Sequence, residues 1–325
     1  SGDEDLPAVL KLFRRQFTPL TGYGDRQRLI LGLRGADAPE RCKLLSSRVL
    51  EPEKDARLIR DAIFVLSDTR RTDSVEEAIA QSREARGWTR WRWLQALGSM
   101  AHPAARAELF EVARNGRASA DRIAALRALA RPQDTEVVPL CAADGEGAWQ
   151  LRAAKVRVLR TIAAGDAFPA LVKHLKDPLP RVRYDAQEGL VTLAEGRDFG
   201  DAAGLWLDWW KAKQEGRAVS NAGHGVPVGR YGSYYGIPLL PGRVCFIIDV
   251  SGSMNEELSR SCLDYVQRQR TLRGKKITTR LDLAKAELIR ALQELDRKSA
   301  FQVIWYASHV QQWSRDGARK AGAVN

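Results

Sequence analysis

Three oxygen-bearing side chains at alternate positions, Asp249, Ser251 and Ser253, directly follow an apolar run late in the sequence. That run, residues 244–248, is rich in β-branched and aromatic side chains and too short for a helix, which predicts a strand buried on both faces. Because alternate side chains of an extended chain point the same way, we expect the three oxygen donors to converge. They would lie at the carboxyl end of the strand, where open α/β sheets bind ligands.

The chemistry that suits this cluster is the coordination of a hard divalent cation. Mg²⁺ prefers oxygen ligands in octahedral geometry and retains several waters. One carboxylate and two neutral hydroxyls leave the cation with residual positive charge and an open position, which an Asp or Glu of a partner can fill. Calcium sites carry more carboxylates, so the donor set favours Mg²⁺ or Mn²⁺. The alternative is a polar turn that ends a strand.

Two enzymatic interpretations do not fit these residues, and we predict a non-enzymatic protein. An aspartyl-nucleophile phosphatase usually has a second Asp two residues after the first, where this chain has Ser251. A serine hydrolase elbow needs the pattern G-x-S-x-G, and here Asp249 and Ser253 occupy the two glycine positions. The sequence also contains no P-loop or dinucleotide fingerprint.

The elements expected around the cluster form a strand–helix–strand unit. An amphipathic stripe predicts a helix over about residues 279–295, and Thr279 with Asp282 resembles a capping arrangement at its start. A second apolar strand is expected at residues 301–306, parallel to the first, and a short hairpin strand near residues 310–313.

The pattern D-x-S-x-S at Asp249, Ser251 and Ser253 resembles the metal-ion-dependent adhesion site of von Willebrand factor A (vWA) domains. The match extends to Met254 and to an Arg-Leu-Asp-Leu-Ala-Lys helix that begins at Arg280. The resemblance implies an α/β Rossmann-like fold and a divalent cation that binds an acidic side chain of a protein partner. Such domains are longer and draw a Thr and an Asp from later loops. We therefore expect residues 242–325 to be the N-terminal part of a vWA domain, truncated or degenerate. Truncation would leave the metal site weak or empty.

Basic residues without any acidic residue fill the segment between the first strand and its helix, residues 267–280. We interpret them as a positive rim that steers an acidic partner toward the metal site. A solvated insertion is the alternative, and nucleic-acid or phosphate binding through this loop is a weaker one. The rim residues are Arg268, Arg270, Arg273, Lys275, Lys276 and Arg280.

Residues 1–213 are expected to form helices throughout, arranged in pairs. Second helices of successive pairs begin near Arg122, Lys155 and Val182, in steps of 33 and 27 residues. First helices are expected to begin near Ser74, Pro103, Gln133 and Asp166. A drifting period of this size predicts an α-solenoid, because each helix pair buries only one face and neighbours must stack.

One repeat carries a more specific pattern. Residues 166–186 contain a first helix that ends in Asp177-Pro178, and a second that begins Pro180-Arg-Val-Arg. This segment resembles HEAT-type repeats, which implies a scaffold for protein binding. The leading hypothesis is a HEAT-like scaffold that presents a cation-dependent vWA site. The alternative makes the solenoid surface the binding site, with the vWA part regulatory or vestigial.

Two tryptophan clusters share helical faces in this region. We expect packing between repeats, and an exposed ligand-binding aromatic patch is the alternative. The clusters are Trp88, Trp91 and Trp93, and Trp206, Trp209 and Trp210.

Residues 214–241 are rich in Gly, Ser, Tyr and Pro, which predicts a linker between the two domains. Its tyrosines, Tyr231, Tyr234 and Tyr235, indicate a segment held against a surface.

Composition sets further bounds on the 325-residue chain. Its net charge of +12 reflects arginines dispersed along helices, interpreted as solvated faces. The four cysteines form no C-x-x-C pair, which disfavours zinc, and Cys245 is expected in the core. No apolar run approaches the ~20 residues of a membrane span. A soluble protein is expected, with the compartment, cytoplasmic or secreted after removal of an N-terminal signal, left open.

Overall fold

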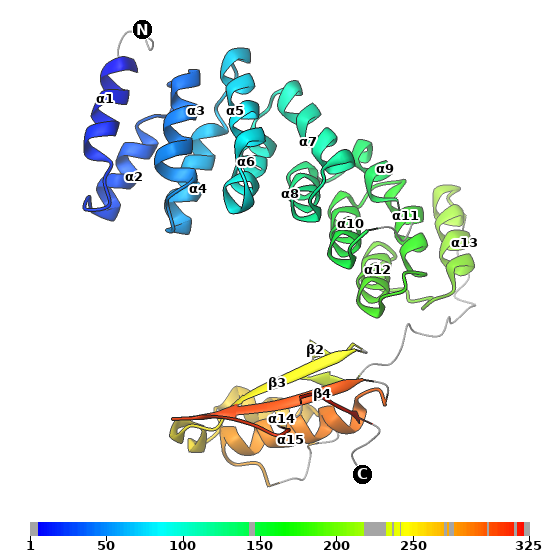
Figure 1. Cartoon of the computed structure of the whole chain (residues 1–325). Helices are drawn as coiled ribbons and strands as arrows, with labels where there is room; N and C mark the ends of the chain where they lie inside the picture. The colour runs from blue at the N-terminus through cyan, green and yellow to red at the C-terminus, as the bar shows by residue number, and fades with distance from the viewer. Residues whose placement is uncertain are drawn as a thin grey trace. The chain divides into compact units, whose positions relative to one another are not determined.

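The chain forms two compact units, Ser1–Val226 and Pro227–Asn325 (Figure 1). The computed structural model describes residues 6–142, 147–217, 232–235, 237–240, 242–269, 272, 276–297, 299–314 and 317–321. Over these residues the first unit is helical, and the second combines helices with a small mixed sheet. A helical part followed by an α/β part is the coarse fold that the sequence predicts.

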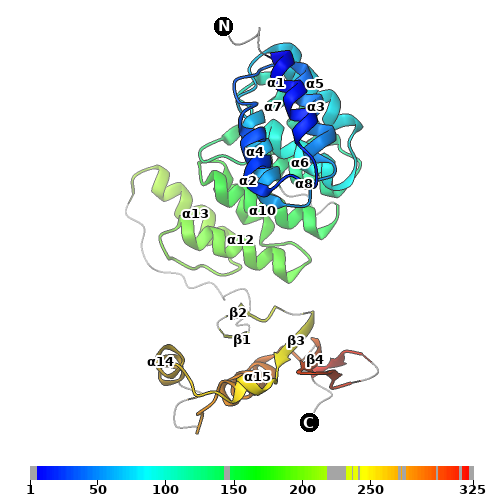
Figure 2. The ribbon, with the colours of Figure 1, turned by 90° about the vertical axis from the view of Figure 1, so that its left-hand side faces the viewer.

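The first unit stacks its helices in two layers. Each even-numbered helix from α2 to α12 contacts the next even-numbered one (Figure 2). In the other layer, α3 contacts α5, and α5 contacts α7. The helices are α1 (Leu6–Gln16), α2 (Tyr23–Leu31), α3 (Pro39–Leu45), α4 (Ala56–Leu66), α5 (Thr72–Glu84), α6 (Gly87–Ser99), α7 (Pro103–Asn115), α8 (Ser119–Leu129), α9 (Val138–Cys141), α10 (Trp149–Ile162), α11 (Ala167–His174), α12 (Pro180–Leu193) and α13 (Ala203–Gln214). Two shorter turns are η1 (Ser46–Leu50) and η2 (Thr135–Val137).

The paired helices expected from the repeat pattern are confirmed. The second helices correspond to α8, α10 and α12, although α10 begins at Trp149 and not near Lys155. The first helices correspond to α5, α7, the η2–α9 segment and α11. Pro39, Pro103 and Pro180 begin their helices, where the missing N–H breaks no intrahelical hydrogen bond.

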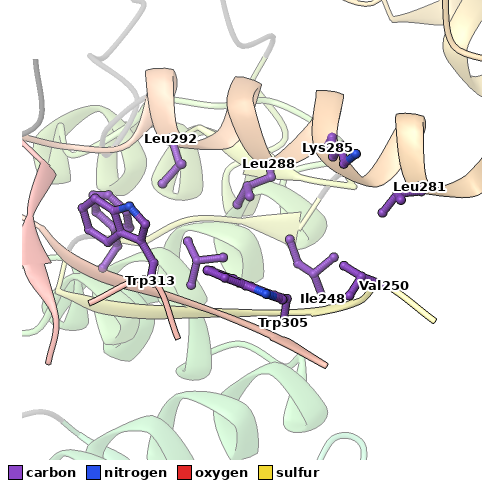
Figure 3. A pocket seen from close by; sticks show the side chains of 10 residues that line it. Ile248, Val250, Leu281, Lys285, Leu288, Leu292, Trp305 and Trp313 are labelled. Atoms are coloured by element: carbon purple, nitrogen blue, oxygen red, sulfur yellow. The ribbon is translucent and has the colours of Figure 1, made fainter. Parts of the chain in front are cut away.

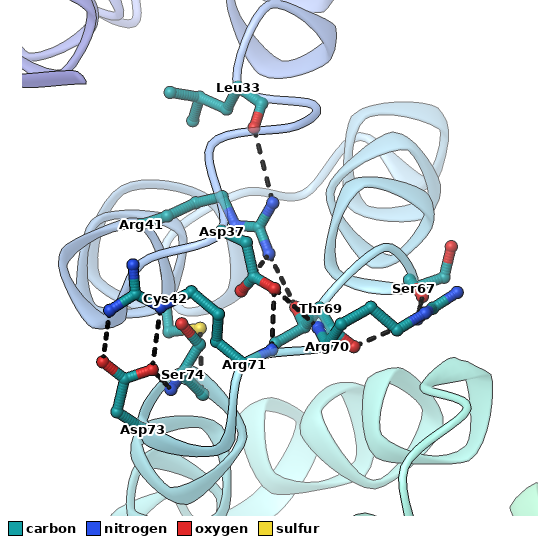
Figure 4. Close-up of polar contacts among 10 residues, drawn as sticks. All are labelled: Leu33, Asp37, Arg41, Cys42, Ser67, Thr69, Arg70, Arg71, Asp73 and Ser74. Carbon is teal, nitrogen blue, oxygen red and sulfur yellow. Dashed lines mark hydrogen bonds and ion pairs between the residues drawn. The ribbon is translucent and has the colours of Figure 1, made fainter. Parts of the chain in front are cut away.

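A buried polar cluster ties the α2–α3 loop to the α4–α5 loop (Figure 4). The Arg41 side chain is fully buried and lies 3.5 Å from Asp37, while its Nη2 donates to Thr69 Oγ1 at 2.7 Å. Asp37 Oδ2 accepts from the backbone amides of Arg70 and Arg71 at 2.6 and 2.8 Å. Burial lowers the pKa of Arg41, and the Asp37 charge opposes that shift.

The tryptophan clusters divide between core and surface. Trp93 is fully buried and its Nε1 donates to Ser46 Oγ at 3.3 Å. Trp206 and Trp209 are buried around Phe168, as expected for packing between helices. Trp88 is 75 % exposed, so packing does not account for this member of the first cluster.

The second unit contains the strand–helix–strand arrangement expected from the sequence. Strands β3 (Arg243–Asp249) and β4 (Ala300–Tyr306) pair in parallel, and α15 (Arg280–Glu294) connects them. Strands β5 (Val310–Gln312) and β6 (Arg319–Lys320) pair antiparallel with β4. The Thr279–Asp282 capping box at the start of α15 is confirmed.

Strand β6 and two further elements of this unit were not expected. Helix α14 (Arg260–Arg268) lies in a polar stretch for which the sequence predicted no regular element. A hairpin of β1 (Ser233–Tyr234) and β2 (Ile237–Pro238) lies within the proposed linker.

The prediction that the first strand is buried on both faces is wrong. Phe246 and Ile248 are buried on the face toward α15, whereas Ile247 is 65 % exposed and Cys245 is exposed on the other. Since no described element covers this second face, Cys245 is not the core residue that its apolar neighbours suggest. Apolar side chains allow a strand face to be buried, but the face is buried only where another element covers it.

The hairpin is held against α15 by a buried ion pair. Arg290 Nη2 donates to Glu287 Oε2 at 2.7 Å and to the Ser233 carbonyl at 2.9 Å. The Tyr235 amide donates to Glu287 Oε2 at 3.0 Å. The expectation that this segment is held to a surface is confirmed for Tyr234 and Tyr235, and Tyr231 lies outside the described residues.

Candidate functional site

The structure brings Ser251 into contact with both other members of the oxygen cluster. Asp249 is the last residue of β3, and the Ser251 amide donates to its Oδ1 at 2.8 Å. The Oγ atoms of Ser251 and Ser253 lie 3.1 Å apart. The three side chains that the sequence singles out therefore form one connected group at the carboxyl end of a parallel strand.

The backbone of this loop is anchored to both strand and helix. The Val250 amide donates to the Tyr306 carbonyl at 2.9 Å and so extends the ladder between β3 and β4. Residues Gly252–Asn255 form the turn η3, which contacts α15, and Met254 packs on the core. The oxygen donors thus lie on a turn whose two sides are both fixed by contacts with regular structure.

The local hydrogen bonds favour the charged form of Asp249. Donation from the Ser251 amide is the main cause that lowers the pKa of this carboxyl, and the Ser251 hydroxyl contributes in the same direction. At neutral pH the loop therefore presents one carboxylate and two hydroxyls. Ser253 is exposed and the other two side chains are partly exposed, so a ligand can reach them.

This donor set fits Mg²⁺ or Mn²⁺. The carboxylate of Asp249 would be the charged ligand of a cation, the two hydroxyls would contribute neutral oxygens, and waters can complete an octahedral shell. Among the residues that the structure describes, no three His, Cys, Asp or Glu side chains gather into a metal cluster. The Asp249 loop differs from such clusters because it has a single carboxylate.

The segment before α15 passes close to this loop. The Arg280 amide donates to the Glu256 carbonyl at 3.1 Å, and the Arg280 guanidinium pairs with the Glu256 carboxylate at 2.9 Å. At the same helix start, hydrogen bonds led by the Thr279 amide lower the pKa of Asp282 to about 2. The chain thus returns to the η3 turn just before it enters α15.

The expected basic rim is only partly described. Arg268 and Lys276 are exposed, whereas Arg280 pairs with Glu256 and so its charge is partly neutralised. The remaining members, Arg270, Arg273 and Lys275, lie outside the described residues.

An apolar groove of about 560 Å³, which the sequence did not reveal, begins beside the loop (Figure 3). It runs between α15 and the sheet from Val250, the residue between Asp249 and Ser251, to Trp313. The α15 stripe expected in the core is only half-buried here at Leu281, Leu288 and Leu292. The sequence signal for this groove was the apolar stripe of α15, which is longer than two strands can cover. Lys285 is the charged side chain in the lining.

No protein-family model matches the chain, and no curated protein matches its sequence. No helix within the described ranges combines the length and the apolar character needed to cross a membrane.

Proposed function

We propose that the loop at Asp249, Ser251 and Ser253 binds Mg²⁺ or Mn²⁺, and that the bound cation recognises an acidic side chain of a protein partner. The observation that carries this proposal is the connected contact from Asp249 through Ser251 to Ser253 at the carboxyl end of β3. The function is that of a non-enzymatic interaction protein.

The fold assignment belongs to the same proposal. We infer that the second unit is a vWA-type domain, supported by the parallel β3–α15–β4 unit and by the D-x-S-x-S residues at the end of its first strand. We infer that the first unit is a HEAT-like α-solenoid, supported by the two layers of successive helices and by the position of Pro180 at the start of α12.

Each residue of the loop has a distinct part in binding. Asp249 supplies the negative charge that attracts a cation, and the amide of Ser251 fixes the carboxylate by holding one of its oxygens. The hydroxyls of Ser251 and Ser253 add neutral oxygen donors, so the positive charge is not cancelled. A bound cation would supply a Lewis-acidic position that an incoming carboxylate can occupy.

The test is the melting temperature of the whole chain with and without Mg²⁺, followed by scanning fluorimetry. At a Mg²⁺ concentration 100-fold above Kd, binding stabilises the folded unit by about 2.7 kcal/mol, which raises its melting temperature by several degrees. Asp249→Ala is expected to remove the shift, and Asp264→Ala, at an exposed position of α14, to leave it unchanged. A wild-type chain that melts at the same temperature with Mg²⁺ and with EDTA would contradict the proposal.

A further inference from the structure

Individual helices of the first unit differ in charge. Helices α6 and α10 of the even-numbered layer carry basic residues and no Asp or Glu. In the other layer, α5 carries Asp73, Glu76, Glu77 and Glu84 against a single Arg83. Part of the positive excess of the chain is therefore concentrated on particular helices, α6 and α10 among them.

A groove of about 600 Å³ lies in the even-numbered layer, across α4, α6 and α8. Its apolar lining includes Ile59 and Ile63 of α4 and the rings of Trp88 and Trp91 of α6. The two rings meet edge to face, with centroids 5.8 Å apart. Trp88 is 75 % exposed, and a large exposed aromatic ring next to an apolar hollow is a common feature of binding surfaces.

The charged side chains that line this groove, called here the Trp88 groove, are all basic: Lys54, Arg60, Arg92 and Arg127. None of these four forms an ion pair with a carboxylate among the described residues, whereas elsewhere in this unit Arg90 pairs with Asp121 at 2.9 Å. Arg92 is positioned by donation from Nη1 to the Leu50 carbonyl at 2.5 Å. The groove therefore combines an apolar floor with unneutralised cations.

The basic character continues along the layer beyond the groove. Arg60, Arg92, Arg127 and Arg160 follow one another at intervals of 32, 35 and 33 residues, one from each of α4, α6, α8 and α10. Neighbouring packed helices have axes ~8–10 Å apart, so the arginines are available as a ladder to an extended ligand. Arg160 lines the next hollow, together with Arg157.

We propose that the Trp88 groove binds an extended acidic segment of a protein partner, with an aromatic or aliphatic side chain of that segment on Trp88. The carboxylates on either side of the inserted side chain pair with Arg60, Arg92 and Arg127, since guanidinium groups bind carboxylates in a bidentate manner. The proposal goes beyond the cation-dependent function, because it places a second binding surface on other helices and needs no metal.

The lining favours a peptide over a nucleic acid. Ile59 and Ile63 form an aliphatic pocket that suits an inserted side chain. Single-stranded nucleic acids are bound by stacking successive bases on several open rings. The edge-to-face contact of Trp88 with Trp91 leaves Trp88 as the open ring of this pair.

The test uses the full chain in EDTA and three fluorescein-labelled peptides, followed by fluorescence anisotropy at low salt. One peptide has Phe between pairs of Glu, the second replaces every Glu by Gln, and the third replaces Phe by Gly. The first is expected to bind, and each replacement to weaken binding about tenfold or more, the size of the loss when contacts to a charged group or an apolar anchor are removed. A twelve-residue oligothymidine serves as the nucleic-acid probe.

Variants locate the site. Trp88→Ala and the double variant Arg60→Gln, Arg127→Gln are expected to weaken the first peptide about tenfold, whereas Trp149→Ala and Arg114→Gln change neither its affinity nor the fold. All of these side chains are exposed, so circular dichroism should be unchanged in every variant.

Several results would overturn the proposal: no binding of the first peptide at 1 mM (roughly the weak limit of specific recognition), equal binding of the Gln peptide, or equal loss in the control variants. Tighter binding of the oligothymidine than of the first peptide would also overturn it and assign the surface to nucleic acid. Asp249→Ala is expected to bind the first peptide normally. Loss of peptide binding in the groove variants therefore leaves the proposed metal site untested, and the two proposals can fail independently.

Discussion

The buried Arg41 cluster gives a sharp test of how the helices of the first unit are held together. The perturbation is Arg41→Met, which keeps the long side chain and removes the charge. It leaves Asp37 without its ion pair, and Thr69 Oγ1 and the Leu33 carbonyl without their donor, inside a site where Arg41 is fully buried.

The expected loss follows from those contacts. Breaking a buried ion pair by removing one partner costs ~3–5 kcal/mol, because the other charge stays buried. The Asp37 side chain is 18 % exposed and retains the amides of Arg70 and Arg71, and the guanidinium–carboxylate distance is a long 3.5 Å. We therefore expect a loss at the lower end, about 3 kcal/mol. Arg41→Lys keeps the charge but loses the planar guanidinium group. Its stability should therefore lie between those of Arg41→Met and the wild type.

Amide hydrogen exchange of residues 39–50, read by mass spectrometry, is the suitable assay because opening in helical repeats can be local. A loss of about 3 kcal/mol corresponds to exchange more than 100-fold faster. The control is Arg48→Met, at an exposed position of η1. Its free energy of opening should remain within about 0.5 kcal/mol of the wild-type value. Exchange in Arg41→Met that matches the Arg48→Met control would refute the reasoning.

Three other predictions follow from local features. Burial raises the pKa of the Cys42 and Cys141 thiols to about 12, so native maleimide labelling, read by mass spectrometry, should modify exposed Cys245 and spare these two. The Asp282 pKa of about 2 lies below its ordinary 3.8, so its stabilisation of the folded state is present above pH 3.8 and lost as pH falls through about 2. Melting curves by circular dichroism should show this acid loss, and Asp282→Asn should remove the Asp282 component. A Cβ at Gly98 would lie 2.6 Å from a side-chain carbon of α8, so Gly98→Ala should destabilise the first unit by ~1–3 kcal/mol in urea unfolding.

Each of these has a contrary outcome. Labelling of Cys42 at the rate of Cys245 would mean that α3 opens readily. An acid transition unchanged by Asp282→Asn would place the responsible carboxylate elsewhere. A neutral Gly98→Ala would mean that α6 and α8 can separate slightly without loss, against the close contact in the structure.

Elements with strong periodicity were predictable from the sequence, because local patterning and tertiary contacts agree there. The stripe and capping box of α15, the apolar β4 and the repeated helices α8, α10 and α12 are examples. The order of Asp249, Ser251 and Ser253 after β3 was equally visible, since alternation along an extended chain is a local property.

What the sequence did not reveal depends on distant partners. Exposure of Cys245 could not be predicted, because a β-branched run does not say whether a second layer covers it. Helix α14 was missed because its apolar residues, Cys262, Leu263, Tyr265 and Val266, are interspersed with charged and polar neighbours in a short segment. Composition predicted a linker held against a surface, but it did not show that the partners of Ser233 and Tyr235 would be the Glu287–Arg290 pair.

The Trp88 groove shows the same limit. Trp88 and Trp91 share a helical face, which their spacing predicts. The contributions of Ile59 from α4 and Arg127 from α8 depend on the stacking of three helices, although the roughly constant interval between Arg60, Arg92 and Arg127 was a usable signal.

Titration of the whole chain with Mn²⁺, with the free ion followed by electron paramagnetic resonance, tests the central claim most directly. The proposal predicts saturable binding of one Mn²⁺ ion that Mg²⁺ displaces and that Asp249→Asn abolishes, because the variant keeps the shape of the side chain and loses its charge. Binding of equal stoichiometry and affinity in Asp249→Asn, or no binding in the wild type, would contradict it.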